Sequence, residues 1–109
     1  MSKVPAVDIM IMSGPDDGLI LNLTAPKQGD SYILGRRDDC DVVLAYDSQI
    51  SRQHTRLFMV DGRWHVQDLG SRNGTYIGKQ KIQTVAPIEP GQLFRLGRTW
   101  LRIQRKSGE

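Results

Sequence analysis

The sequence predicts an all-β domain, a β-sandwich of two mainly antiparallel sheets. Short stretches of apolar or alternating residues recur along the chain, turn residues such as Gly, Pro and Asp separate them, and helical periodicity is hard to find. Packing two sheets face to face is the economical way to bury many short strands. The 109 residues fit one small domain and leave little room for a second.

Ten stretches fit the strand pattern. In chain order they cover residues 7–12, 19–23, 31–35, 42–44, 55–60, 63–69, 75–77, 81–82, 92–96 and 99–104. Turn-forming residues stand between several of them, at 15–18, 29–30, 78–79 and 90–91. Because these stretches are many and short, they all point to the same fold class.

The clearest hairpin joins residues 55–60 to residues 63–69. Asp61 and Gly62 lie between the two stretches and tolerate the positive φ angles of a two-residue hairpin turn. The alternation predicts that one face of this hairpin brings together the apolar side chains of Leu57, Met59, Trp64 and Val66.

Composition excludes several classes of protein. No apolar run approaches the roughly 18 residues of a membrane-spanning helix, and the first residues lack the apolar core and cleavage site of a secretory signal. The single cysteine, Cys40, permits no internal disulfide and no cysteine-based metal cluster, and two histidines do not complete a zinc site. We therefore expect a cytoplasmic protein without a metal ion or a cofactor.

The net charge of +3 is unevenly distributed along the chain. Residues 1–34 hold two Lys or Arg against four Asp or Glu, whereas residues 35–109 hold thirteen against eight. A basic excess of this kind is either a solvated surface or a site for an anionic partner. Charge alone does not separate nucleic acid, phosphate and acidic protein as that partner.

Three segments between strands hold more hydrogen-bond donors than a connection needs. They are residues 35–37, 50–54 and 68–75. Their donors are the guanidinium groups of Arg36, Arg37, Arg52 and Arg72, with Arg56 just beyond, and the polar side chains of Ser51, Ser71, Asn73 and Thr75. This mixture suits a phosphate, because a dianion with several acceptor oxygens needs converging donors and Arg presents a planar fork to two oxygens at once.

The order of these segments predicts that they meet. Residues 50–54 lead into the hairpin and residues 68–75 leave it, so both emerge at the same end of the sheet. The basic groups would then share one rim, with no carboxylate before Asp68 at its edge.

Three fragments of these segments resemble the signature of the forkhead-associated (FHA) domain family. They are Gly35-Arg36, Ser51-x-x-His54 and Leu69-Gly70-Ser71-x-Asn73-Gly74-Thr75. The resemblance covers nearly the whole chain, and the order and spacing of the fragments make it specific. It implies an eleven-stranded β-sandwich that binds phosphothreonine peptides through loops at one end, without catalysis.

The resemblance also implies roles for individual residues. Arg36 and Ser51 would bind phosphate oxygens directly, through a charge-assisted pair and a hydroxyl respectively. Arg52 and Arg72 would add phosphate contacts by side chain or backbone N–H. Asn73 would hold the main chain of the peptide next to the phosphothreonine.

Four further positions have implied roles outside the phosphate site itself. His54 would brace the binding loops by hydrogen bonds, and Gly35 and Gly74 would meet the backbone requirements of the loops. Gln49 lies in the loop that commonly reads the third residue after the phosphothreonine. Its neutral amide predicts neither a strictly acidic nor a strictly basic preference.

The resulting hypothesis is a phosphopeptide-binding module that docks phosphorylated partner proteins in Ser/Thr kinase signalling, monomeric as an isolated domain. The alternatives are a scaffold for phosphate-independent protein interaction or self-assembly and, with less support, a nucleic-acid-binding protein. A platform for single-stranded nucleic acid would need aromatic residues interleaved with exposed basic residues, whereas Trp64, Trp100 and the other aromatic residues are expected in the core. Cys40, between two aspartates, is expected to be unreactive.

The ends of the chain carry little apolar content. We expect residues 1–5 and 105–109 to be loosely attached to a domain spanning residues 6–104. The basic residues after position 104 are consistent with a chain cut from a longer protein.

Overall fold

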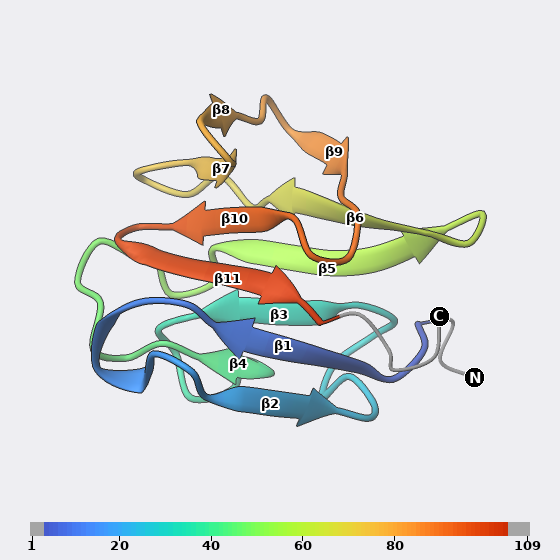
Figure 1. Ribbon diagram of the computed structural model, residues 1–109, viewed down its shortest axis with the longest axis horizontal. Helices are drawn as coiled ribbons and strands as arrows, with labels where there is room; N and C mark the ends of the chain where they lie inside the picture. Colours follow the sequence, from blue (N-terminus) through green and yellow to red (C-terminus); the bar gives the residue numbers. More distant parts are fainter. Residues whose placement is uncertain (1–3, 105–109) are drawn as a thin grey trace.

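The computed structural model describes residues 4–104 and places eleven strands of that range in two packed sheets (Figure 1). The six-stranded sheet has the order β2 (Ile20–Leu23), β1 (Val7–Ile11), β11 (Thr99–Ile103), β10 (Leu93–Leu96), β7 (Thr75–Ile77) and β8 (Gln80–Lys81). The five-stranded sheet has the order β4 (Val42–Val43), β3 (Tyr32–Gly35), β5 (Thr55–Val60), β6 (Arg63–Asp68) and β9 (Val85–Pro87). The all-β sandwich predicted from the sequence is confirmed.

The pairings within the sheets are antiparallel, except that the described strands β3 and β4 run parallel. A short 3-10 turn, η1 (Gly14–Asp16), follows β1. No helix of the described residues is long and apolar enough to cross a membrane.

The core lies between the two sheets and is built by the alternation of side chains along the strands. In β1 and β11 every second residue is buried, as the pleat of a strand requires when one face is covered. The largest completely buried side chains come from both sheets and include Tyr32, Leu34, Leu57, Phe94, Leu101 and Ile103. The two layers therefore share one apolar core.

The predicted hairpin is formed by β5 and β6. Leu57 pairs with Val66 and Met59 with Trp64, as the alternation predicted. The connecting residue Asp61 has φ 50° and Gly62 has φ 79°, which are the positive angles expected of this turn.

The sequence analysis missed one strand and misplaced another. It identified ten stretches and did not include β9, which is three residues long, half-buried or exposed throughout, and ends in Pro87. Proline is tolerated there because β9 lies at the edge of its sheet, where one side of the backbone needs no partner. The predicted strand 81–82 is β8, which begins one residue earlier, and Ile82 turns into the core instead.

The expected loose ends need a partial correction. Residues 1–3 and 105–109 lie outside the described residues. Val4, however, is buried in the core cluster, and the carbonyl oxygen of Pro5 accepts a hydrogen bond of 2.9 Å from the Tyr32 hydroxyl. The packed fold therefore includes residues 4 and 5.

The topology gathers the three donor-rich segments at one end of the sandwich. The β3–β4, β4–β5 and β6–β7 loops all emerge there, on the left in Figure 1. The β5–β6 turn, the start of β1 and the end of β11 lie at the other end.

Candidate functional site

The β3–β4 and β4–β5 loops are joined backbone to backbone. Arg36 donates its N–H to the carbonyl oxygen of Ser51, and Arg37 donates to that of Arg52, each at 3.2 Å. Gly35 permits this contact, since a Cβ at that position would lie 2.1 Å from the Arg52 carbonyl oxygen and 3.1 Å from the sulfur of Cys40. The glycine of the Gly-Arg fragment is thus required by close approach of another chain segment.

Arg36 is exposed, and its side chain is nevertheless fixed at one atom. Its Nε donates a hydrogen bond of 2.6 Å to the carbonyl oxygen of Ile50. Its two terminal nitrogens have no partner among residues 4–104 and remain available. The neighbouring Arg37 differs, because its guanidinium pairs with the carboxylate of Asp39 at 2.7 Å.

Ser51 connects the β4–β5 loop to the β6–β7 loop. Its Oγ accepts a hydrogen bond of 3.0 Å from the backbone N–H of Arg72, which leaves the hydroxyl proton of Ser51 free to be donated. The same bond occupies the Arg72 N–H, so only the exposed side chain of Arg72 is left for an anion. Arg52 is likewise exposed and has no ion-pair partner within the described part of the chain.

His54 lies directly beneath these loops and is completely buried. Its Nδ1 accepts a hydrogen bond of 3.0 Å from the Ser51 N–H, and its Nε2 lies 2.8 Å from the carbonyl oxygen of Gly74. A nitrogen that accepts from an N–H carries no proton, so the pair of contacts fixes the neutral tautomer with the proton on Nε2. Burial lowers the pKa of His54, against the opposing effects of the Gly74 carbonyl and of Asp68.

Asp68 organises the β6–β7 loop from inside. Its carboxylate accepts hydrogen bonds from the Ser71 hydroxyl at 2.5 Å, the Ser71 N–H at 3.0 Å and the Thr75 hydroxyl at 2.7 Å. Burial alone would raise the pKa of Asp68, but these bonds and the neighbouring His54 lower it. The hydroxyls of Ser71 and Thr75 therefore serve the loop, which corrects their inclusion among the phosphate donors.

Asp47 does the same for the β4–β5 loop, and the sequence analysis did not identify it. The buried carboxylate accepts hydrogen bonds from the N–H groups of Gln49 at 3.0 Å and Arg98 at 2.8 Å, and from the Thr99 hydroxyl at 2.7 Å. Burial would raise the pKa of Asp47, but these hydrogen bonds lower it. The loop that carries Ser51 is thereby tied to the β10–β11 turn of the opposite sheet.

Asn73 and Gln49 also lie together. The Nδ2 of Asn73 donates to the backbone oxygen of Gln49 at 2.8 Å and to its Oε1 at 3.2 Å. The side-chain oxygen of Asn73 has no partner within residues 4–104 and can accept a hydrogen bond. The following residue, Gly74, has φ +83°, an angle that few other residues adopt readily.

Two expectations about neighbouring side chains are wrong. Arg56 does not join the rim, because its side chain lies on the outer face of the five-stranded sheet, bonded to Gln67 and Ser31. Trp64, Tyr32 and Phe94 are part of the core, whereas Trp100, Tyr76 and Phe58 are only half-buried and Tyr46 is exposed. Trp100 lies on the outer face of the six-stranded sheet.

The donors gathered on these loops are suited to an anion. The three loops that meet around Ser51 carry Arg36, Arg52 and Arg72, each with guanidinium N–H groups that have no partner among residues 4–104, while the carboxylates of Asp47 and Asp68 are taken up by hydrogen bonds within the fold. Among residues 4–104, no group of three or more His, Cys, Asp or Glu could hold a metal ion. Cys40 is free and buried, and burial raises the pKa of its thiol, as expected for an unreactive cysteine.

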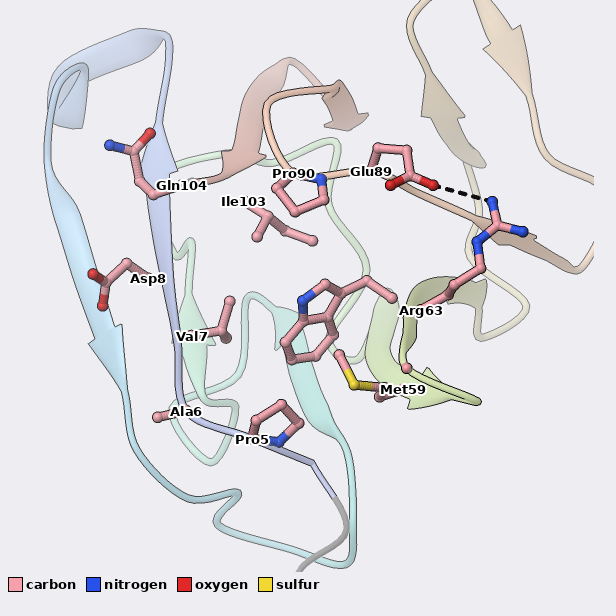
Figure 2. Close-up of a pocket in the computed structure, with 12 residues that line it drawn as sticks. Pro5, Ala6, Val7, Asp8, Met59, Arg63, Glu89, Pro90, Ile103 and Gln104 are labelled. Carbon is pink, nitrogen blue, oxygen red and sulfur yellow. Dashed lines mark hydrogen bonds and ion pairs between the residues drawn. The ribbon is translucent and has the colours of Figure 1, made fainter. Parts of the chain in front are cut away.

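A cavity of the described residues lies away from this site. Figure 2 shows it at the end of the sandwich where β1 begins, with a volume of about 390 Å³. Apolar side chains line most of it, including Val7, Met59, Trp64 and Ile103, and the ion pair of Arg63 and Glu89 lies at its edge. None of the donors of the three loops contributes to it.

Comparison with known proteins gives a consistent family. The family model described as FHA domain matches residues 32–97. FHA domain-containing protein FhaB of Mycobacterium tuberculosis is 39% identical over 72 residues, which are 66% of this chain and 46% of the relative. The chain spans about half the length of such curated relatives.

Solved structures agree with the sandwich. The FHA domain of an Arabidopsis thaliana hypothetical protein is 27% identical with a TM-score of 0.80, covering 99% of this chain and 92% of that one. Mycobacterium tuberculosis EmbR in complex with a low-affinity phosphopeptide is 21% identical with a TM-score of 0.78, covering 96% of this chain and 26% of that one. The second similarity is one of fold.

Proposed function

The chain belongs to the FHA domain family, and from this premise we propose that it is a non-enzymatic module that binds phosphothreonine-containing segments of partner proteins. Such a ligand is the product of a Ser/Thr protein kinase, so the module acts downstream of one. Its proposed location is the cytoplasm, because a reducing compartment keeps a single thiol such as that of Cys40 free.

The observation that carries this proposal is the surroundings of the Ser51 hydroxyl. The backbone N–H of Arg72 holds its oxygen, and the free ends of three guanidinium groups lie on the loops around it. A phosphate ester offers three acceptor oxygens and close to two negative charges, which matches a hydroxyl donor among several forked cations.

Each residue has a specific part in the proposed complex. Arg36 and Ser51 donate to the phosphate oxygens, and the side chains of Arg52 and Arg72 add positive charge. Asn73 keeps its Nδ2 on Gln49 and accepts a main-chain N–H of the peptide with its free oxygen. Gln49 is the position proposed to contact a residue beyond the phosphothreonine.

Relatives support the proposal without deciding it. The solved structure of EmbR, whose fold this chain shares, is a complex with a low-affinity phosphopeptide. Preference for phosphothreonine over phosphoserine depends on one methyl group, worth roughly 0.8 kcal/mol by burial and about 1–3 kcal/mol in a fitted pocket. The proposed ligand is a phosphothreonine segment, which belongs either to another protein or to the protein that carries this domain.

A titration with matched peptides tests the function. A degenerate phosphothreonine library first selects a sequence, which is then made with threonine, phosphothreonine and phosphoserine at the central position. We expect binding of the phosphothreonine form, weaker binding of the phosphoserine form and none of the unmodified form, with affinity falling as salt rises.

Two other outcomes would replace the proposal. Equal binding of the phosphorylated and unmodified peptides would indicate a phosphate-independent scaffold. Binding of a DNA control with a steep salt dependence and no response to phosphorylation would indicate a nucleic-acid-binding protein.

A further inference from the structure

One row of side chains on the outer face of the six-stranded sheet has no part in the site described above. It consists of Lys81 on β8, Tyr76 on β7, Arg95 on β10 and Trp100 on β11. These residues are direct cross-strand partners, so their side chains stand next to one another on the same face. We call them the Lys81–Trp100 row.

The row alternates cationic and aromatic side chains. The guanidinium carbon of Arg95 lies 4.1 Å from the centre of the Tyr76 ring and 5.6 Å from that of the Trp100 ring. Arg95 also donates from Nη1 to the carbonyl oxygen of Gly97 at 2.6 Å, which leaves Nε and Nη2 without a partner in the described residues. The stack therefore presents a fixed guanidinium edge to solvent.

The row adjoins the proposed peptide site. A Cβ built on Gly74 would lie 2.7 Å from Cε of Lys81 and 3.5 Å from its Nζ, so this side chain rests on the backbone next to Asn73. The row is also the one nearest the loop end of the sheet, because Tyr76 and Trp100 are the second residues of strands that begin there. A peptide held by Asn73 can continue directly onto it.

The charge of this face is one-sided. Lys81, Arg95 and Arg102 point outward from it, and none of them pairs with a carboxylate within residues 4–104. Asp8 is the only acidic side chain among the outward-facing strand positions that the structure describes, and it accepts a hydrogen bond of 2.8 Å from Asn22. The complementary ligand is therefore anionic.

We propose that the Lys81–Trp100 row binds an acidic segment of the same partner polypeptide that carries the phosphothreonine. This inference rests on the proposed function and adds a second recognition element to it. Neighbouring strands are about 4.8 Å apart and an extended chain advances about 3.3 Å per residue, so roughly five residues span the row. The carboxylates of the segment pair with Lys81 and Arg95, and its aliphatic parts pack on the rings of Tyr76 and Trp100.

An acidic peptide fits this row better than a nucleic acid does. The Arg95 guanidinium occupies the position over the Tyr76 ring in which a base would stack. Its unpaired N–H groups match the two oxygens of a carboxylate.

The test compares a short phosphothreonine peptide with the same peptide extended by about five acidic residues, placed before or after the phosphothreonine, and with neutral Asn/Gln extensions. For the wild-type domain we expect one acidic extension to raise affinity about threefold to tenfold, the gain of two or three exposed charge pairs. The neutral extensions should give no gain.

Two substitutions and two matched controls assign the gain. Lys81→Gln and Arg95→Gln should each reduce it and leave the affinity for the short peptide unchanged. Lys79→Gln removes the same charge from the exposed β7–β8 turn, and Arg56→Gln removes an arginine stacked 4.1 Å above Phe58 on the opposite sheet. Both controls should retain the full gain. Lys81→Glu should convert the preference to a basic extension.

The possible failures are distinguishable. If the short phosphopeptide binds but no acidic extension strengthens it, or Lys81→Gln keeps the gain, this inference is wrong and the proposed function stands. A third outcome would assign the row to nucleic acid instead. In it, oligothymidylate competes with the acidic extension for the wild-type domain, and Arg95→Gln loses its affinity for oligothymidylate. If the wild-type domain does not discriminate phosphothreonine from threonine, both proposals fall.

Discussion

Ser51 donates its backbone N–H to Nδ1 of His54 across 3.0 Å, so the residue whose hydroxyl is proposed to bind phosphate is held at its backbone by a buried imidazole. The other ring nitrogen bonds the Gly74 carbonyl, which belongs to the loop that carries Asn73. One neutral ring thus holds both loops of the proposed site at a fixed distance. If Nδ1 were protonated, its N–H would face the N–H of Ser51, and this hydrogen bond would be lost.

This relationship predicts a pH dependence of stability. Burial lowers the pKa of His54 below its usual 6.5, so the unfolded chain binds the proton more readily than the folded one does. The stability is then fully present above about pH 6.5 and falls as the pH drops below that value.

Urea unfolding of the unliganded domain at several pH values measures this effect. The unliganded form is required because the phosphate of a ligand itself titrates near about pH 6. His54→Ala should destabilise the domain by roughly 2–4 kcal/mol and remove this part of the pH dependence. A wild-type stability that stays constant between about pH 7 and about pH 5 would contradict the assignment.

Arg36→Ala should weaken phosphothreonine-peptide binding by at least about a hundredfold, since it removes up to two charge-assisted hydrogen bonds to the phosphate. The melting temperature should change little, because the Arg36 side chain is exposed and makes one hydrogen bond within the fold, and the backbone bond to Ser51 remains in the variant. Isothermal titration and thermal unfolding of the same preparation give both values.

The matched control for Arg36 is Arg37→Ala. Arg37 is also exposed and adjacent in sequence, but its guanidinium is already paired with Asp39. Its loss should lower affinity only slightly. Equal losses in the two variants would show that the effect of Arg36 is general electrostatic attraction and not a contact.

Asp47→Ala should lower both stability and affinity. It leaves the N–H groups of Gln49 and Arg98 and the hydroxyl of Thr99 without their acceptor, which we expect to cost about 1–3 kcal/mol of folding free energy. Hydrogen exchange should show faster exchange of the amides in the β4–β5 loop. Affinity that is unchanged despite such loosening would mean that Asp47 does not position Ser51.

The strands and the gathering of the loops could be predicted because they depend on neighbours in sequence. The alternation of Leu57 and Met59 fixed the face of the hairpin, and a hairpin necessarily brings the residues before and after it to one end. The sequence analysis missed β9 because this short edge strand, which ends in Pro87, lacks the alternation of apolar and polar residues that marks a strand.

The two organising carboxylates could not be predicted for a different reason. Asp47 accepts hydrogen bonds from Arg98 and Thr99, which are about half the chain away in sequence. The residues next to Asp47 in the sequence do not indicate these partners. Asp68 takes up the hydroxyls of Ser71 and Thr75, so a count of donors overstated what was free for phosphate. Which polar groups are satisfied within the fold is a property of tertiary structure.

Gly35→Ala should disrupt the site through the backbone. The new Cβ would overlap the Arg52 carbonyl oxygen, which a backbone atom cannot avoid without moving the whole β4–β5 connection. We expect a loss of about 3 kcal/mol or more and no phosphopeptide binding. Gly29→Ala is the control, because the new Cβ has open space around it. Only the positive φ of +67° is unfavourable for alanine there, and we expect it to lower the folding stability by roughly 1–2 kcal/mol.

Asn73→Ala should separate peptide binding from phosphate binding. The substitution removes the side-chain oxygen proposed to accept a main-chain N–H and the Nδ2 contact to Gln49, but it leaves the donors around Ser51 in place. We expect roughly a tenfold loss of affinity for the phosphothreonine peptide, with its dependence on phosphorylation retained.

Gln49→Ala is the informative comparison for Asn73. Asn73 can keep its stronger bond, which goes to the Gln49 backbone oxygen at 2.8 Å, because that atom remains after the substitution. Affinity for the selected peptide should therefore change less than in Asn73→Ala, while the residue preference at one position beyond the phosphothreonine changes in a library. If Gln49→Ala instead reproduces the whole loss of Asn73→Ala, the role of Asn73 is to hold the β4–β5 loop and not the peptide.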